Sequence, residues 1–471
     1  MISGLKPYAA MKDSGVEWLG AVPAHWGIVP AFAAYRPREV RNTGMAEKTV
    51  LSLSYGRIVI KPEEKLRGLV PESFETYQIV EPGNIIVRTT DLQNDRNSLR
   101  IGHAKDRGII TSAYLCLETT GQVENEFGYQ YLNAYDLLKI IYGYGSGLRQ
   151  NLDFKDIKRM PVLLPPKDEQ VAIVRFLDHA DRRIRRAIVA KQKLIRLLEE
   201  QRRAIIHRAV TRGLDPDVRL KPSGIEWLGD VPELWEIRAF SRCAIERADY
   251  RGATPAKTES GIFLVTARNV RKGAIDYQIS KEYVAESDYA TVMRRGLPKI
   301  GDVLLTMEAP LGNVALVDRE DVAFAQRVVR FRMDPRKFVP EFVLNSMLSS
   351  YFQIQLLSRG TGSTALGIKA SKLPQLQILC PPVFEQNQIL EHIRREVAPL
   401  DDQVDRARAE IELLREYRTR LVADLVTGKL DVREAAANLP EMIEPSDTEF
   451  DVDEDNEEDS MEEITTEDQA A

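Results

Sequence analysis

The chain of 471 residues is 44% hydrophobic and 29% charged, with 65 basic and 71 acidic side chains, a composition typical of two to four folded domains. It contains neither a stretch of roughly 18 uncharged apolar residues nor, in residues 1–12, the apolar core of a signal peptide, so a cytoplasmic location is expected. The three cysteines and five histidines lack metal-ligand spacing, and neither a disulfide framework nor a metal site is predicted.

The first predicted element is an anchor segment that recurs later in the chain. Residues 14–26, SGVEWLGAVPAHW, match residues 223–235, SGIEWLGDVPELW, and the two copies hold all four tryptophans. Two tryptophans with a glycine and a proline at fixed places are typical of a packed turn, because each indole buries a large area. We expect both anchors to be structural.

Each anchor is followed by a variable segment and then by a second repeated block. Residues 164–170, LPPKDEQ, match residues 380–386, CPPVFEQ, at an offset of 216. The variable segments between anchor and block, residues 31–164 and 240–380, show little similarity to each other. The unit of anchor, variable segment and PPxxEQ block therefore occurs twice.

The residues after each PPxxEQ block are predicted to form a long helix. Over residues 393–425 seam positions are spaced alternately by four and three, as in a coiled coil, and the register is kept over residues 177–209. Pro399 is expected to kink the second helix or to divide it. The first helix, residues 168–212, has a net charge of +6 and the second, residues 384–428, of −3, so antiparallel pairing of one with the other is expected.

The chain ends in an acidic tail. Residues 441–471 contain 15 acidic side chains and no lysine or arginine, so the rest of the chain carries a net charge of +9. A segment with so few apolar side chains cannot offset its ordering entropy, and we predict disorder. The tail is interpreted as solubilising; the alternative is a phosphate mimic that competes for a basic groove.

These elements predict an α+β fold with a pseudo-twofold internal repeat. Two globular mixed α/β domains would be separated by two long helices that pack antiparallel. The predicted parts are, in chain order, a first recognition domain (1–163), a first spacer helix (164–214), a second recognition domain (215–379), a second spacer helix (380–432) and the acidic disordered tail (433–471).

Two similar but non-identical domains on a basic body suit a bipartite duplex site, in which each domain binds one half-site and the helices fix the interval. The anchors, the PPxxEQ blocks with their helices and the duplicated variable segments closely resemble the specificity subunit of type I restriction-modification systems, over about residues 8–432. The resemblance implies that the variable segments are target-recognition domains and that the chain binds an asymmetric site in double-stranded DNA.

The same resemblance implies partners and cofactors. The helices would dock methyltransferase (modification) subunits, and whether restriction (translocase) subunits also join is left open. S-adenosylmethionine, ATP and Mg²⁺ would be used by those partners, with no cofactor in this chain. The acidic tail is not a usual part of the pattern.

Short polar and basic side chains on loops are the groups that contact phosphates and base edges. In the first domain the candidates for DNA binding are Ser52, Ser54, Tyr55, Arg88, Thr89, Asn94, Arg96, Asn97, Ser146, Arg149 and Gln150. In the second domain they are Arg268, Asn269, Arg271, Lys272, Thr306, Arg327, Arg359, Thr361, Ser363, Thr364 and Lys369.

Catalytic motifs for ATP binding, methyl transfer or metal-dependent cleavage are not found in the sequence. A non-catalytic specificity subunit is therefore predicted. The alternatives are a self-sufficient site-specific nuclease and a coiled-coil interaction scaffold that does not bind DNA.

Overall fold

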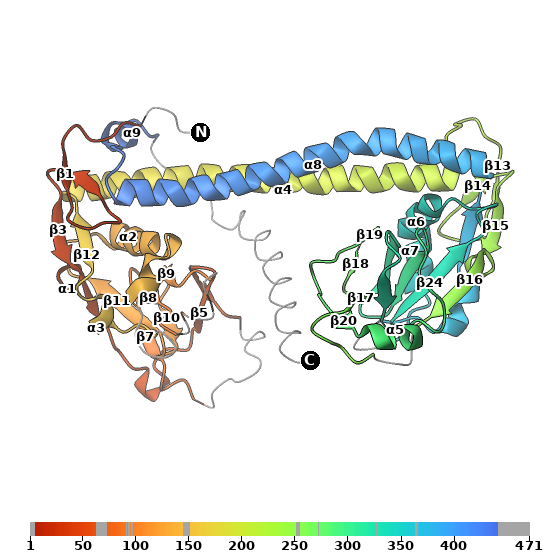
Figure 1. Cartoon of the computed structure of the whole chain (residues 1–471). Coiled ribbons are helices and arrows are strands. Elements are labelled where there is room, and N and C mark those ends of the chain that lie inside the picture. The colour runs from red at the N-terminus through yellow and green to blue at the C-terminus, as the bar shows by residue number, and fades with distance from the viewer. Residues whose placement is uncertain are drawn as a thin grey trace. The chain divides into compact units, whose positions relative to one another are not determined.

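The computed structural model (Figure 1) describes two compact units. The first consists of the chain up to Gln192 together with the segment from Arg408 onward, and the second of Lys193–Ala407. None of the helices within the described ranges is both long and apolar enough to cross a membrane. The described residues are 5–62, 73–90, 92, 95, 98–144, 151–250, 255–271, 273–325, 327–362 and 366–440.

The first unit is built mainly of short strands. They are β1 (Met11–Asp13), β2 (Ala21–Pro23), β3 (Gly27–Pro30), β4 (Tyr35–Pro37), β5 (Leu51–Ser54), β6 (Arg57–Ile60), β7 (Gln78–Val80), β8 (Ile85–Val87), β9 (Ile101–His103), β10 (Gly108–Ile110), β11 (Leu115–Thr119) and β12 (Pro161–Leu164). The α-helices that lie wholly in this unit are α1 (Ala31–Ala34), α2 (Asn125–Leu137), α3 (Phe154–Ile157) and α9 (Arg433–Ala437).

The second unit has a similar content. Its strands are β13 (Leu220–Pro222), β14 (Asp230–Pro232), β15 (Glu236–Ala239), β16 (Ala244–Asp249), β17 (Ile262–Val265), β18 (Val270–Arg271), β19 (Ala274–Ile275), β20 (Tyr283–Val284), β21 (Val303–Met307), β22 (Leu311–Leu316), β23 (Val322–Phe324), β24 (Val328–Met333) and β25 (Gln377–Cys380). The α-helices wholly in this unit are α5 (Glu286–Val292), α6 (Pro340–Leu348) and α7 (Ser350–Leu357). Two long helices, α4 (Lys167–Arg212) and α8 (Val383–Val426), contribute to both units.

The central sheets of the two units have the same topology. The strand order is β4-β11-β8-β9 in the first and β16-β24-β21-β22 in the second, with antiparallel neighbours throughout. In each sheet the strand that comes first in the chain, β4 or β16, pairs with the one that comes last, β11 or β24. The two strands between them in the chain, β8 and β9 or β21 and β22, follow on the other side of that last strand. The pairs β1–β2 and β3–β12 likewise correspond to β13–β14 and β15–β25. Two variable segments of little sequence similarity thus form one fold.

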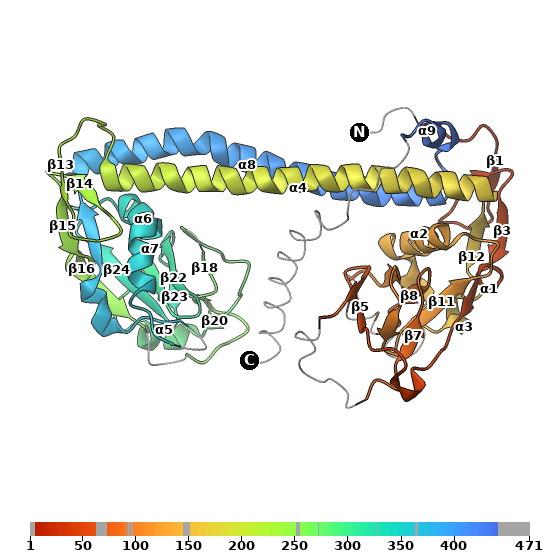
Figure 2. The same ribbon diagram turned by 180° about the vertical axis from the view of Figure 1, so that it is seen from behind.

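Each central sheet is buried on both faces. Along β8, Ile85 and Val87 pack in the main core with α2 and the long helices, whereas Ile86 joins a second cluster with Leu51 on the opposite face. This follows from the alternation of side chains along a strand. Both views show α2 between the sheet and the long helices in the first unit (Figures 1 and 2).

The long helices pack against each other antiparallel within each unit, as predicted. In the first unit Arg418 of α8 pairs with Asp181 of α4 at 2.5 Å. In the second unit Arg202 pairs with Asp401 at 3.0 Å beside an apolar cluster of Leu198, Leu400 and Val404. α8 is one helix from Val383 to Val426 and is not divided at its internal proline, Pro399.

The C-terminal boundary differs from the sequence-based expectation. Residues 433–437, assigned to the disordered tail from composition, form helix α9, whose Ala436 is buried in the first core with Val432. The alanine-rich sequence REAAA explains the helix, since alanine has the highest helix propensity. The acidic residues 441–471 lie outside the described part of the chain.

Candidate nucleic-acid interface

A buried glutamine ties the start of each long helix to its recognition domain. Gln170 and Gln386, the last residues of the two PPxxEQ blocks, are both fully buried. Each donates from its side-chain amide to two backbone carbonyls and accepts from one backbone N–H at the start of α2 or α6, over distances of 2.6–3.2 Å. The partners are Pro165, Gln122 and Glu124 for Gln170, and Pro381, Lys337 and Val339 for Gln386.

The glutamate that precedes each glutamine has different surroundings in the two units. In the first, the buried carboxylate of Glu169 accepts hydrogen bonds from the Trp26 indole N–H at 2.9 Å and the Tyr8 hydroxyl at 3.1 Å. It also pairs with His25 at 2.6 Å and with Arg433 of α9 at 3.4 Å. This carboxylate therefore joins the anchor, α4 and the C-terminal segment.

The second anchor lacks such a network. Trp235 is 1% exposed, and its indole N–H has no hydrogen-bond partner among the described residues. The equivalent carboxylate, Glu385, is only partly buried and lies beside Gly213, 3.1 Å from where a β-carbon of that glycine would stand. The same sequence motif thus encloses a satisfied indole in one unit and an unsatisfied one in the other.

In the first domain the predicted Arg88 and Thr89 lie at the start of the connection between β8 and β9. Arg88 forms an ion pair with Asp95 at 3.5 Å, within this connection. The Thr89 hydroxyl is buried and donates to the Ala113 carbonyl at 2.8 Å. The Leu152 N–H donates to the Thr89 carbonyl at 2.9 Å, which brings the segment that begins at Asn151 to the same place.

Arg100, which closes the connection, was missed in the sequence. It is fully buried, and its guanidinium donates to the carbonyl of Thr90 at 2.6 Å, to that of Asp95 at 2.5 Å and to the Tyr142 hydroxyl at 3.0 Å. Its backbone N–H donates to the Asp136 carboxylate, whose pKa is raised by burial. Arg100 therefore joins Thr90, Asp95 and Tyr142 from inside the domain.

The second domain has an equivalent cluster at the connection between β21 and β22. The Ile368 N–H donates to the Met307 carbonyl at 2.9 Å, so the segment that begins at Leu366 meets this connection. Arg327 pairs with Glu308 at 3.4 Å, and Thr361 pairs with Gly367 through the backbone. The other predicted residues near this connection are Arg359, which donates to the Gln355 carbonyl of α7, and the exposed Lys369.

Five further residues that were predicted to bind DNA lie on or next to two hairpins. Ser52, Ser54 and Tyr55 belong to β5 and its turn. Arg268 is exposed just before the hairpin β18–β19, and Arg271 is exposed at the end of β18.

Three residues that were predicted to bind DNA are instead buried and hydrogen-bonded inside their own domains. Thr89, Asn269 and Thr306 are at most 8% exposed, and their polar groups bond within their own domains. Asn269 accepts from Thr266 and donates to two carbonyls, and the Thr306 hydroxyl donates to the Pro310 carbonyl at 2.6 Å. The prediction that they are exposed loop residues is wrong. Nine others lie outside the described residues: Asn94, Arg96, Asn97, Ser146, Arg149, Gln150, Lys272, Ser363 and Thr364.

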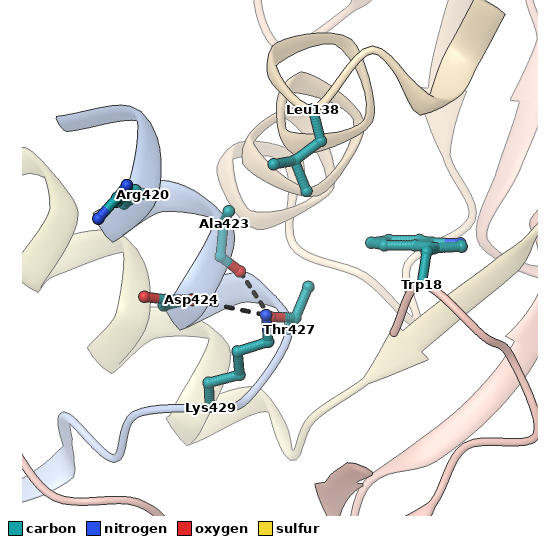
Figure 3. A pocket seen from close by; sticks show the side chains of 7 residues that line it. All are labelled: Trp18, Leu138, Arg420, Ala423, Asp424, Thr427 and Lys429. Atoms are coloured by element: carbon teal, nitrogen blue, oxygen red, sulfur yellow. Dashed lines mark hydrogen bonds and ion pairs between the residues drawn. The ribbon is translucent and has the colours of Figure 1, made fainter. Parts of the chain in front are cut away.

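A cavity of about 260 Å³ lies at the anchor of the first unit (Figure 3). Trp18 and Leu138 form one side, and the end of α8 with Ala423 forms the other. At the place of Ala423 the second unit has His207, whose ring bonds to the Ser350 hydroxyl at 3.1 Å. The cavity therefore lies at the anchor and not among the residues predicted to bind DNA.

Comparison with known proteins finds similarity to specificity subunits of type I restriction enzymes. Residues 42–194 match a family model described as the type I restriction modification DNA specificity domain. The type I restriction enzyme MjaVIII specificity subunit of Methanocaldococcus jannaschii is 23% identical over 339 residues, 69% of this chain and 75% of the relative. The type I restriction enzyme EcoBI specificity subunit of Escherichia coli is 23% identical over 321 residues, 64% of this chain and 66% of the relative.

One solved structure shares the fold. It comes from work on complex assembly and conformational transition of the type I R-M system, and its chain aligns with a TM-score of 0.62 at 13% identity. The alignment covers 87% of the present chain and 99% of the other.

Proposed function

We propose that this chain is a specificity subunit of a type I restriction-modification system and that it selects the DNA sequence on which a methyltransferase complex acts; the matched family model and the similar specificity subunits support this. The observation that carries the proposal is the repeated recognition domain. One sheet topology is built twice, and the described residues at the β8–β9 and β21–β22 connections differ between the copies. Two such domains bind two different half-sites of one asymmetric bipartite site.

Specific DNA binding needs both phosphate contacts, which position the protein, and base contacts, which specify the sequence. The net charge of +9 outside the tail supports the first requirement. The two connection clusters and the hairpins support the second, because they gather polar and basic side chains at one end of a rigid sheet.

The partners in this proposal are methyltransferase subunits, which dock on the long helices, and restriction subunits, which join the same complex. Methyl transfer, ATP use and DNA cleavage, with their S-adenosylmethionine, ATP and Mg²⁺, are steps of those partners. The present chain supplies the choice of sequence and no catalytic group.

The experiment is to co-express the full chain with the methyltransferase subunit of its host system and to sequence the methylome of the recipient strain. We expect methylation at one asymmetric bipartite sequence, and none without the present chain. Replacing residues 31–164 by another recognition domain should alter one half of that sequence only.

Two outcomes support the alternatives instead. Cleavage of DNA by the purified chain alone, in the absence of partner subunits, identifies a nuclease. A chain that binds the methyltransferase subunit without altering the methylated sequence is a scaffold.

A further inference from the structure

Each recognition domain carries a short hairpin at the same place in its fold. The hairpin β5–β6 precedes β8 in the chain and contacts β9, the last strand of the first sheet. The hairpin β18–β19 precedes β21 and contacts β22, the strand equivalent to β9 in the second sheet. In the first hairpin Ser54 pairs with Arg57, and in the second Arg271 pairs with Ala274.

The first hairpin is fixed through its apolar face. Leu53 and Ile58 lie directly over Gly102 of β9, so close that a β-carbon there would stand 2.6 Å from Leu53 Cδ1 and 2.8 Å from Ile58 Cδ1. Side chains alternate along a strand, so Ser52 and Ser54 face away from the sheet. At the tip, Tyr55 is 41% exposed and has a φ of +44°, followed by Gly56 at +80°.

The second hairpin is fixed through its backbone. The Asn313 side-chain amide of β22 donates to the Val270 carbonyl at 2.8 Å, and the Gly273 N–H donates to the Val314 carbonyl at 2.8 Å. Asn269, at the base of the hairpin, is held by hydrogen bonds on both sides of its amide. Arg271 is exposed next to the turn.

The arginines of the connection clusters are already paired with acids of their own domain, Arg88 with Asp95 and Arg327 with Glu308. For the Arg271 guanidinium, no hydrogen bond or ion pair is found with any described residue. A planar guanidinium with free donors is the group that binds the O6 and N7 edge of guanine through two hydrogen bonds.

We propose that the two hairpins are the base-reading elements of the two half-sites, and that Arg271 recognises a guanine in the second. This inference rests on the proposed function and deepens it. A two-stranded ribbon fits the major groove, where every base pair presents a distinct pattern of donors, acceptors and methyl groups. In the first half-site Ser52 and Ser54, on the outer face of the other hairpin, supply the equivalent contacts.

The experiment measures binding of the assembled complex to a library of DNA duplexes randomised in both half-sites, at two salt concentrations. In the Arg271→Ala complex we expect discrimination at one G·C pair of the second half-site to fall about tenfold or more. The first half-site should be unchanged. Arg271→Lys should lose the same discrimination while it keeps the salt dependence, since lysine retains the charge and lacks the planar fork.

The matched control is Arg247→Ala. Arg247 is also exposed, on β16 at the opposite edge of the same sheet, so its loss removes one charge without touching the hairpin. A double Ser52→Ala and Ser54→Ala variant serves as the reciprocal test, with altered preference expected in the first half-site only. Hydrogen exchange of each variant complex, compared with the wild type, confirms that the recognition domains stay folded.

The outcomes separate the inference from the proposed function. If Arg271→Ala weakens binding to all sequences equally, with a smaller salt slope, then Arg271 contacts phosphate and the base-reading role is overturned. Unchanged selectivity in the folded Arg271→Ala complex overturns it as well. If the wild-type complex itself shows no sequence preference, the proposed function fails first.

Discussion

Each recognition domain encloses one arginine completely, and the two domains neutralise it differently. Arg100 in the first domain donates mainly to two backbone carbonyls of the β8–β9 connection and to the Tyr142 hydroxyl. Arg330 in the second lies within the sheet, where it pairs with Asp302 at 2.6 Å and with Glu246. One arginine therefore fixes the backbone of a connection between two strands, and the other offsets the buried carboxylate of Asp302 beside strands β16, β21 and β24.

The largest effect is expected for Arg330→Met. Removing one partner of a buried ion pair leaves the other charge uncompensated, which lowers the free energy of unfolding. Asp302 still has Arg332 at 2.8 Å, so we expect a loss at the lower end of the usual range, about 3 kcal/mol. Hydrogen exchange of the full chain should show lost protection in the second unit only. As a control, Arg319→Met removes an exposed partner of Asp321 and should cost less than about 1 kcal/mol. Equal losses in the two variants would contradict the assignment.

Arg100→Met is expected to lose less stability than Arg330→Met but to change DNA recognition as well. The carbonyls that it leaves are partly reached by water at the loop, so we expect a cost of about 2 kcal/mol. The shape of the β8–β9 connection should be lost with it. The methylome should then show relaxed preference in the first half-site and an unchanged second half-site. Loss of both half-sites together would mean that Arg100 supports the whole fold.

The anchors give a matched pair of variants. Trp26→Phe removes the indole donor to the buried Glu169, whereas Trp235→Phe removes an indole N–H that has no described partner. Both lose similar apolar area, so the difference between them isolates the hydrogen bond to a charged group, about 1.5 kcal/mol. Chemical denaturation of both full-length variants, followed by hydrogen exchange in each unit, measures it. If the second variant is the more destabilised, the Glu169 network is not what holds the first anchor.

The smallest effect is expected for deletion of residues 441–471. Arg175 of α4 donates to the Leu439 carbonyl at 2.8 Å, so the deletion can begin after Pro440 without disturbing the described chain. We predict less than about a threefold gain in DNA affinity, under roughly 0.7 kcal/mol. Titrations at two salt concentrations decide it. A tenfold gain that shrinks as salt rises would show that the tail competes with DNA.

The sequence predicted the repeat, the mixed fold and the paired long helices, because these depend on local period and on motifs that recur. It did not predict the common strand order of the two domains. Strand pairs such as β4–β11 join residues about eighty positions apart, and no local pattern encodes which partner is chosen.

The candidate DNA-binding residues were predicted from residue type. Residue type alone does not distinguish a buried side chain that hydrogen-bonds within its domain from an exposed one that is free to contact DNA. Thr306 and Arg271 both stand near strand ends, yet the first turns its hydroxyl inward to the Pro310 carbonyl and the second stays exposed. Arg100 gave no signal at all, since its burial depends on Tyr142, which lies 42 positions later in the chain. Such choices are made by tertiary packing.

The two buried glutamines have a consequence for how these proteins diverge. The hydrogen bonds that the Gln170 and Gln386 side chains make with described residues of the variable segments all go to main-chain carbonyls and N–H groups. A joint of this kind makes no demand on which side chains the neighbouring segment carries, provided that its backbone begins a helix at the right place. Recognition domains can therefore accumulate substitutions, or be acquired whole from another lineage, without any compensating change at the joint that receives them.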